Sequence, residues 1–127
     1  MISAEDLMAK ADKALASAII LLASEDTDGA CNRAYYAIYD AARAALIKSG
    51  YEEIALTTKT HNGLISAFSM NLVKPNKLPV ELGRIFNKVE DMRLMADYLE
   101  KSIEMDKSAW AVEQAKIFIN QVKAQIF

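Results

Sequence analysis

Cysteine and histidine are almost absent from this sequence, and each shortage excludes a kind of site. The one cysteine, Cys31, rules out an intrachain disulfide and any metal site built from several cysteines. The one histidine, His61, argues against zinc and di-iron sites, which combine several histidines and carboxylates at fixed spacing. The sequence also lacks a glycine-rich phosphate loop, a serine nucleophile elbow and a His-Glu-x-x-His helix. We therefore expect no metal and no cofactor.

Proline and glycine are scarce as well, and their scarcity favours helix. Only two prolines and four glycines interrupt 127 residues, of which 53% are hydrophobic. Alanine, leucine, glutamate and lysine are abundant, and such side chains lose little rotamer freedom in a helix. The length is that of one domain. We expect a single all-α domain over residues 1–127.

Strong charge and long apolar runs are also missing. The net charge is −2, so bulk electrostatics do not draw the chain to nucleic acid or to an anionic membrane, and any RNA contact must be local. The most apolar run, residues 14–23, is half of the roughly 20 residues that a membrane span needs. The N-terminal residues are acidic, whereas a secretory signal begins with positive charge. A cytoplasmic location without membrane contact is the expectation.

Capping residues and helical periodicity divide the chain into five expected helices. These run approximately over residues 4–23, 29–49, 58–73, 79–100 and 107–127. The expected N-caps are Ser3, Asp26 or Asp28, Thr57 or Thr58, and Asp106 or Ser108, and residues 51–56 are expected to form a loop. Gly50 suits the left-handed position after a helix, and Pro79 suits a first turn. Short connections predict an antiparallel up-and-down bundle of about five helices.

The second expected helix carries a polar stripe opposite its core face. At 100° per residue the stripe contains Asn32, Arg33, Tyr36, Asp40 and Arg43. The opposite, core face contains Ala34, Tyr35, Ile38, Ala41, Ala42 and Ala45. The stripe is either a solvated face with ordinary ion pairs or a rim that recognises a polar partner or a second copy of the chain. Three tyrosines at positions 35, 36 and 39 cannot all face one core, so at least one of them is expected to meet a partner.

The fourth expected helix places an arginine inside its apolar stripe. That stripe contains Leu82, Ile85, Phe86, Val89, Met92, Ala96 and Leu99. Arg93 falls within it, and an uncompensated buried charge is costly, so Arg93 needs a partner. Glu90 and Asp97 lie one turn to either side. Arg93 is either half of a structural ion pair or lines a functional cleft together with Asp97.

His61 lies in the first turn of the third expected helix, on the core-facing side that it shares with Leu64, Ile65, Phe68 and Leu72. It is either a hydrogen-bonded structural residue or a general base that a substrate reaches. Tyr98, Trp110 and Phe118 have the spacing of packing residues.

Three segments in matching order resemble the HEPN family (higher eukaryotes and prokaryotes nucleotide-binding). They are Asn32-Arg-Ala-Tyr-Tyr-Ala-Ile-Tyr-Asp-Ala-Ala-Arg-Ala-Ala-Leu, Lys59-Thr-His-Asn-Gly-Leu-Ile-Ser-Ala-Phe and Arg93-Leu-Met-Ala-Asp-Tyr. The resemblance implies an antiparallel helical bundle that dimerises. It also implies a place beside a small nucleotidyltransferase, in toxin–antitoxin or phage-defence operons. Many members are metal-independent ribonucleases whose motif is an arginine followed four to six residues later by histidine.

The sequence departs from that ribonuclease motif. No arginine precedes His61 at the required distance, Asp40 follows Arg33 at the seventh position, and Asp97 and Tyr98 follow Arg93. An aspartate ionised at neutral pH repels a phosphate. The candidate catalytic residues are Arg33, His61 and Arg93, and the candidate binding residues are Asn32, Tyr36, Asp40, Asp97 and Tyr98.

Three functional hypotheses remain open, and the sequence does not decide whether the chain is an enzyme. The first is a dimeric subunit of a toxin–antitoxin or defence-type two-component system that binds a nucleotidyltransferase partner or a nucleotide. The second is a metal-independent ribonuclease toxin that acts on RNA. The third is a purely structural bundle. Under the first hypothesis Tyr98 or Tyr36 is a candidate target of nucleotidyl transfer from the partner.

Overall fold

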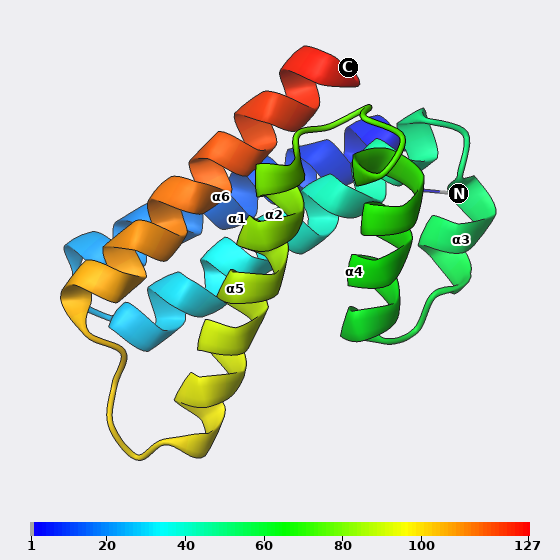
Figure 1. The fold of residues 1–127 in the computed structure, drawn as a ribbon. Helices are drawn as coiled ribbons and strands as arrows, with labels where there is room; N and C mark the ends of the chain where they lie inside the picture. Colours follow the sequence, from blue (N-terminus) through cyan, green and yellow to red (C-terminus); the bar gives the residue numbers. More distant parts are fainter. Residues whose placement is uncertain (1) are drawn as a thin grey trace.

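The computed structural model describes residues 2–127, and within them it contains six helices, one π-helical turn and no strand (Figure 1). The long helices are α1 (Ala4–Ala23), α2 (Thr27–Lys48), α5 (Val80–Tyr98) and α6 (Met105–Gln125). Between α2 and α5 lie the shorter α3 (Glu52–Thr57) and α4 (His61–Phe68) and the π-helical segment Ser69–Val73. The predicted all-α bundle with antiparallel neighbours is confirmed.

The central helix is α2, which packs against α1, α3, α4, α5 and α6. Its buried residues are largely alanines, and the face of α1 that meets it also buries small side chains. Small side chains allow two helix backbones to approach closely without leaving voids. At the other side of α2 the rings of Phe68, Phe86 and Phe118 pack with centroids 5.2 to 5.9 Å apart. The predicted core face of α2 is buried in full.

Several predicted helix ends are confirmed by their capping contacts. The Ser3 hydroxyl accepts a hydrogen bond from the Asp6 amide, and the Asp6 carboxylate accepts one from the Ser3 amide. Asp26 caps α2 by accepting from the Gly29 amide at 2.9 Å. Gly50 has a φ of +94°, the left-handed conformation expected after a helix.

Three predictions around α3, α4 and α6 are wrong. Residues 51–56 are not a loop, because α3 occupies most of them, and the N-cap of α4 is Thr60. Thr57 and Thr58 instead donate their hydroxyls to carbonyl oxygens of α3 and so help to end it. The helix α6 begins at Met105 without a side-chain cap from Asp106 or Ser108. Ser108 is buried and donates to the Thr27 carbonyl at 2.7 Å, which ties the starts of α6 and α2 together.

The second half of α5 does not pack as its sequence pattern predicts. The apolar stripe is buried as far as Val89, Met92 is partly buried, and Leu99 lies beyond the helix with 54% of its surface exposed. Tyr98, which was expected to pack, is 83% exposed. Figure 1 shows the reason, since the lower end of α5 extends beyond the other helices. Trp110 is partly buried and Phe118 fully buried, in line with their predicted packing roles.

No helix within residues 2–127 combines the length and the apolar character that crossing a bilayer requires.

Candidate functional site

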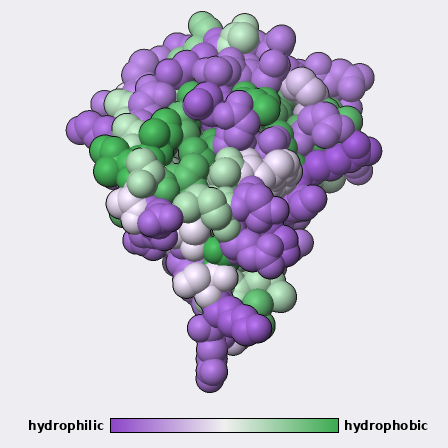
Figure 2. All heavy atoms as spheres, turned by 90° about the vertical axis from the view of Figure 1, so that its left-hand side faces the viewer, coloured by the Kyte–Doolittle hydropathy of each residue, from purple (hydrophilic) through white to green (hydrophobic). Residues whose placement is uncertain are grey.

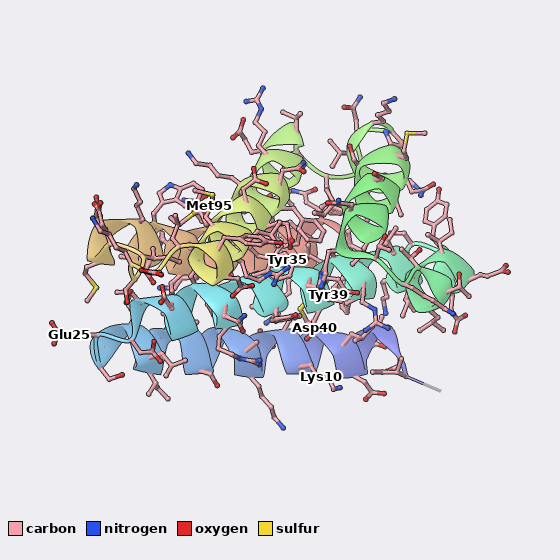
Figure 3. The ribbon with its side chains drawn as sticks, turned by 90° about the horizontal axis from the view of Figure 1, so that it is seen from below. Lys10, Glu25, Tyr35, Tyr39, Asp40 and Met95 are labelled. Atoms are coloured by element: carbon pink, nitrogen blue, oxygen red, sulfur yellow. The ribbon has the colours of Figure 1, made fainter. Side chains whose placement is uncertain are left out.

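The side chain of Tyr35 is the point at which α2, α4 and α5 meet. It is fully buried, and its hydroxyl lies 2.7 Å from Nδ1 of His61, the first residue of α4. The guanidinium carbon of Arg93, from α5, lies 4.8 Å from the centre of the Tyr35 ring. Figure 3 shows Tyr35 and Tyr39 projecting from the side of α2 that bears α4 and α5. The fold therefore brings together a histidine and an arginine that are far apart in sequence.

Two further tyrosines of α2 surround the histidine. The rings of Tyr39 and Tyr36 have centroids 5.2 and 6.1 Å from that of His61, and both are only partly buried. The predicted hydrogen bond of His61 thus exists, through Nδ1. The second ring nitrogen, Nε2, makes no hydrogen bond within residues 2–127, and His61 as a whole is partly buried.

Arg93 is held by a carboxylate on its own helix. Its Nη2 donates to Oε1 of Glu90 at 2.8 Å, and its Nη1 lies 3.6 Å from Oδ2 of Asp97. The side chains of Glu90 and Arg93 are only 5% and 12% exposed, whereas that of Asp97 is 63% exposed. The predicted local partner of Arg93 is therefore Glu90 first, with Asp97 as an outer neighbour. Oε2 of Glu90 and Nε of Arg93 are buried without a partner in the described part of the chain.

This environment changes the acid–base properties of two groups. Burial lowers the pKa of Arg93, but the hydrogen bond and the charge of Glu90 outweigh it, so the pKa is raised overall. Burial also raises the pKa of the Tyr35 phenol far above its ordinary value, and Glu90 raises it further. Tyr35 therefore keeps its proton and Arg93 keeps its charge under all ordinary conditions.

Asp40, another predicted residue of α2, lies on the edge of this helix that faces α1. Asp40 is half-buried, and burial raises its pKa although Arg43, Lys10 and Arg33 oppose this. Figure 3 shows Asp40 between α2 and α1, with Lys10 on α1. No ion pair within 4 Å involves Arg33 or Asp40 across residues 2–127, so neither residue makes the ion pairs that the solvated-face alternative assumed.

The predicted residues consequently form two groups along α2. His61, Arg93 and Tyr36 gather around Tyr35, with Asp97 at the outer edge. The second group consists of Asp40, which lies toward α1, and Arg33, whose charge acts on Asp40, while Asn32 is partly buried on α2. Tyr98 stands apart at the exposed end of α5.

The sequence assigned Tyr35 to the core and did not give it a place in the site. Its spacing in the Tyr-Tyr-x-x-Tyr run was a usable signal, because the core face of α2 is otherwise alanine-rich and a buried phenol needs a hydrogen-bond partner.

A groove beside the second half of α5 was also missed. It has a volume of about 510 Å³ and lies between α5 and the connection to α6. Its apolar lining consists of Met92, Met95, Ala96, Leu99 and Ile103, and lysines 88, 101 and 107 lie at its edges. Large apolar side chains of the same half of α5 are exposed, with Leu94 at 37% and Met95 at 54%. In Figure 2 the lower projection, formed by the end of α5 and the following loop, joins a hydrophilic tip to apolar surface.

The antiparallel helices around α2 and the charged residues converging on it define a helical bundle with a polar centre between α2, α4 and α5. The model of the HEPN domain matches residues 4–125, and the chain belongs to the HEPN domain family.

Relatives in bacteria and archaea cover most of the chain. A UPF0332 protein of Gloeobacter violaceus is 35% identical over 94 residues, which is 74% of this chain and 71% of the relative. A Methanocaldococcus jannaschii protein named a putative toxin is 31% identical over 121 residues, 94% of this chain and 78% of that protein. A second protein of the same archaeon, also named a putative toxin, is 29% identical over 113 residues, or 89% of this chain and 81% of its own length.

Proposed function

We propose that this chain is the HEPN subunit of a toxin–antitoxin or defence-type two-component system, that it works as a homodimer, and that it binds a nucleotidyltransferase partner or a nucleotide. The observation that carries the proposal is the outer half of α5, residues 91–98, where apolar side chains lie exposed beside the charged centre. Relatives that are named putative toxins support the same assignment.

The outer half of α5 has the composition of a protein-binding surface. Large apolar patches rimmed by polar residues mark interaction sites, and methionine and tyrosine are favoured at interfaces. Here Met95 and Tyr98 are 54% and 83% exposed, and the groove next to them has an apolar lining. In an isolated protomer this surface faces water, which is unfavourable unless a partner covers it. Asp97 and Arg93 at its inner edge supply charge for a specific contact.

The experiment is co-expression of the tagged chain with the product of a neighbouring nucleotidyltransferase gene, followed by purification of the complex. We expect Met95→Glu to weaken co-purification by at least about tenfold, because it places a charge in the apolar contact. Ile20→Glu is the matched control, since Ile20 is 68% exposed but lies on α1. Equal loss with both variants, or retention with Met95→Glu, would contradict the assigned surface. If the wild-type chain does not co-purify at all, the proposed partner is wrong.

A ribonuclease function is the second candidate, and one observation favours it. In the fold, His61 and Arg93 both contact Tyr35, although the sequence has no arginine followed by a histidine at the family's spacing. An RNA cleavage assay in the presence of a chelator tests this candidate. Cleavage by the wild-type chain that is lost in Arg93→Ala and His61→Ala would put the ribonuclease ahead of the partner-binding subunit. Arg33→Ala tests whether the α1 edge of α2 contributes to the same activity.

A further inference from the structure

The connection between α5 and α6, residues 99–104, forms part of the groove beside the outer half of α5. It is not helical, and in Figure 1 it runs as a single open arc from the lower end of α5 to the start of α6. Of the residues that line the groove, one set belongs to α5, and the connection contributes Leu99, Lys101, Ser102, Ile103 and Glu104. The groove therefore keeps its shape only while this connection stays in place.

Few contacts hold the connection against the rest of the fold. All of its residues are exposed except Ile103, which is partly buried and packs against the core. Among the amides of residues 100–104, only that of Ile103 makes a hydrogen bond within residues 2–127, and it donates to Oδ1 of Asp28 at 2.8 Å. A segment with so few buried contacts and hydrogen bonds opens more readily than the helices around it.

Asp28 is placed to hold the connection from the start of α2. A hydrogen bond from a backbone amide to a carboxylate is charge-assisted and stronger than one between neutral groups. Next to Asp28, the Thr27 carbonyl accepts from the buried Ser108 hydroxyl at 2.7 Å, so the start of α2 is fixed to α6. The far end of the connection is thus anchored, and the hydrogen bond to Asp28 extends this anchoring to Ile103.

We propose that residues 99–104 are a strap, and that the hydrogen bond from the Ile103 amide to the Asp28 carboxylate is the latch that keeps the groove formed. When the bond is broken, the strap moves away and the groove loses the side chains that the strap contributes. Asp28 is a positioning residue, since it acts on the groove only through the strap. The use of this groove by the nucleotidyltransferase partner rests on the proposed function. A partner that binds the formed groove favours the latched state.

Limited trypsin digestion of the isolated chain tests the latch without a partner. Lys101 lies inside the strap and is exposed, whereas Arg43 lies within α2 and reports opening of the helices. The measure is the initial rate of cleavage after Lys101 divided by that after Arg43, obtained from the fragment masses. We expect Asp28→Ala to raise this ratio at least about tenfold, because it frees the strap alone. A general loss of stability raises both rates and does not mimic the effect.

Two results of the digestion would overturn the latch. The first is an unchanged ratio in Asp28→Ala. The second is wild-type cleavage after Lys101 that is as fast as in an unstructured peptide of the same local sequence, because the strap would then be open already.

Two further variants separate the hydrogen bond from other effects of the substitution. Asp28→Asn keeps a side-chain oxygen that can accept from the Ile103 amide, so we expect a rise of no more than about threefold. Asp12→Ala removes a carboxylate that contacts Lys123 between α1 and α6 at 2.9 Å, and it should leave the ratio unchanged. Equal rises in Asp28→Ala and Asp12→Ala would contradict the latch.

Co-purification with the nucleotidyltransferase partner tests the consequence for the groove. We expect Asp28→Ala to weaken it at least about tenfold and Asp28→Asn to retain most of it. Undiminished co-purification of Asp28→Ala would show that the strap takes no part in the contact and would overturn the link between latch and groove. If the wild-type chain does not co-purify, the proposed partner is wrong, whereas the digestion still decides whether Asp28 holds the strap.

Discussion

The two halves of α5 both carry apolar side chains, but those of the inner half are buried and those of the outer half are exposed. In the inner half, residues 80–90, the apolar stripe of Leu82, Ile85, Phe86 and Val89 is buried against neighbouring helices. In the outer half, residues 91–98, Leu94, Met95 and Tyr98 are exposed. The difference is the presence of neighbours, because Met92 and Arg93 are the last side chains of α5 that pack against the core or lie over the Tyr35 ring of α2, whereas Leu94, Met95 and Tyr98 beyond them are exposed. The inner half therefore contributes stability, and the outer half is available for contacts with other molecules.

The largest effect is expected from a truncation in the inner half. Phe86 is fully buried and packs against Phe68 and Phe118, so Phe86→Ala removes apolar contacts and leaves a cavity. We expect the free energy of unfolding to fall by about 3–5 kcal/mol. Leu94→Ala in the outer half should change it by no more than about 0.5 kcal/mol. Urea unfolding of both variants measures the contrast, and similar losses would show that the two halves do not differ as described.

The second-largest effect is expected on dimerisation, through the polar stripe of α2. If the polar stripe of α2 lies in the homodimer interface, Tyr36→Arg places a charge within it and should convert dimer to monomer, as light scattering would show. Ile20→Arg is the control on the exposed part of α1. A Tyr36→Arg variant that remains dimeric would remove the stripe from the interface, leaving the outer half of α5 as the surface to test.

The inner region could be predicted well from the sequence, for physical reasons. Caps such as Ser3 and Asp26 act within one turn, so local residues determine them. The core face of α2 follows from helical period, because alanines recur on one side opposite the polar stripe. Even the partner of Arg93 was accessible, since Glu90 is one turn away on the same helix.

The outer region and the centre of the site could not be predicted in the same way. The periodicity of α5 continues past Val89, and nothing local shows that its neighbours end there. The hydrogen bond between Tyr35 and His61 joins residues 26 positions apart, so it depends on how α4 is placed on α2. The same is true of Ser108, which was expected to cap α6 but bonds across the fold to Thr27. Long-range contacts of this kind follow from tertiary packing and are not encoded in local pattern.

The exposed position of Tyr98 allows a chemical test of the outer half of α5 as a surface for contacts with other molecules. A nucleotidyltransferase partner that modifies a tyrosine must reach its phenol, and Tyr98 is 83% exposed whereas Tyr36 is partly buried. After co-expression with such a partner we predict the mass of one added nucleotide on the intact protein, lost in Tyr98→Phe and kept in Tyr36→Phe. The opposite result would place the modified residue on α2, and an unmodified wild-type chain would contradict the transfer altogether.

The smallest expected effect is on the pH dependence of stability, at two aspartates whose pKa values are shifted in opposite directions. Burial raises the pKa of Asp40, whereas hydrogen bonds from Ser3 lower that of Asp6. A raised carboxyl pKa means that the folded state binds the proton more tightly than the unfolded state. Its contribution to stability therefore declines as pH rises through the interval above the ordinary value of 3.8. The lowered pKa of Asp6 has the reverse sign, with stabilisation present at neutral pH and lost on acidification.

Asp40→Asn should therefore increase the free energy of unfolding at neutral pH, by about 0.5 kcal/mol or less because the group is half exposed. The gain should shrink as the pH is lowered toward about 3, where Asp40 is protonated in both states. Asp6→Asn should instead destabilise at neutral pH and approach the wild type in acid. Urea unfolding at several pH values gives both curves. If Asp40→Asn destabilises at neutral pH, the attraction of Lys10, Arg33 and Arg43 outweighs burial, and the α1 edge of α2 is held together by charge in the same way as Glu90 and Arg93.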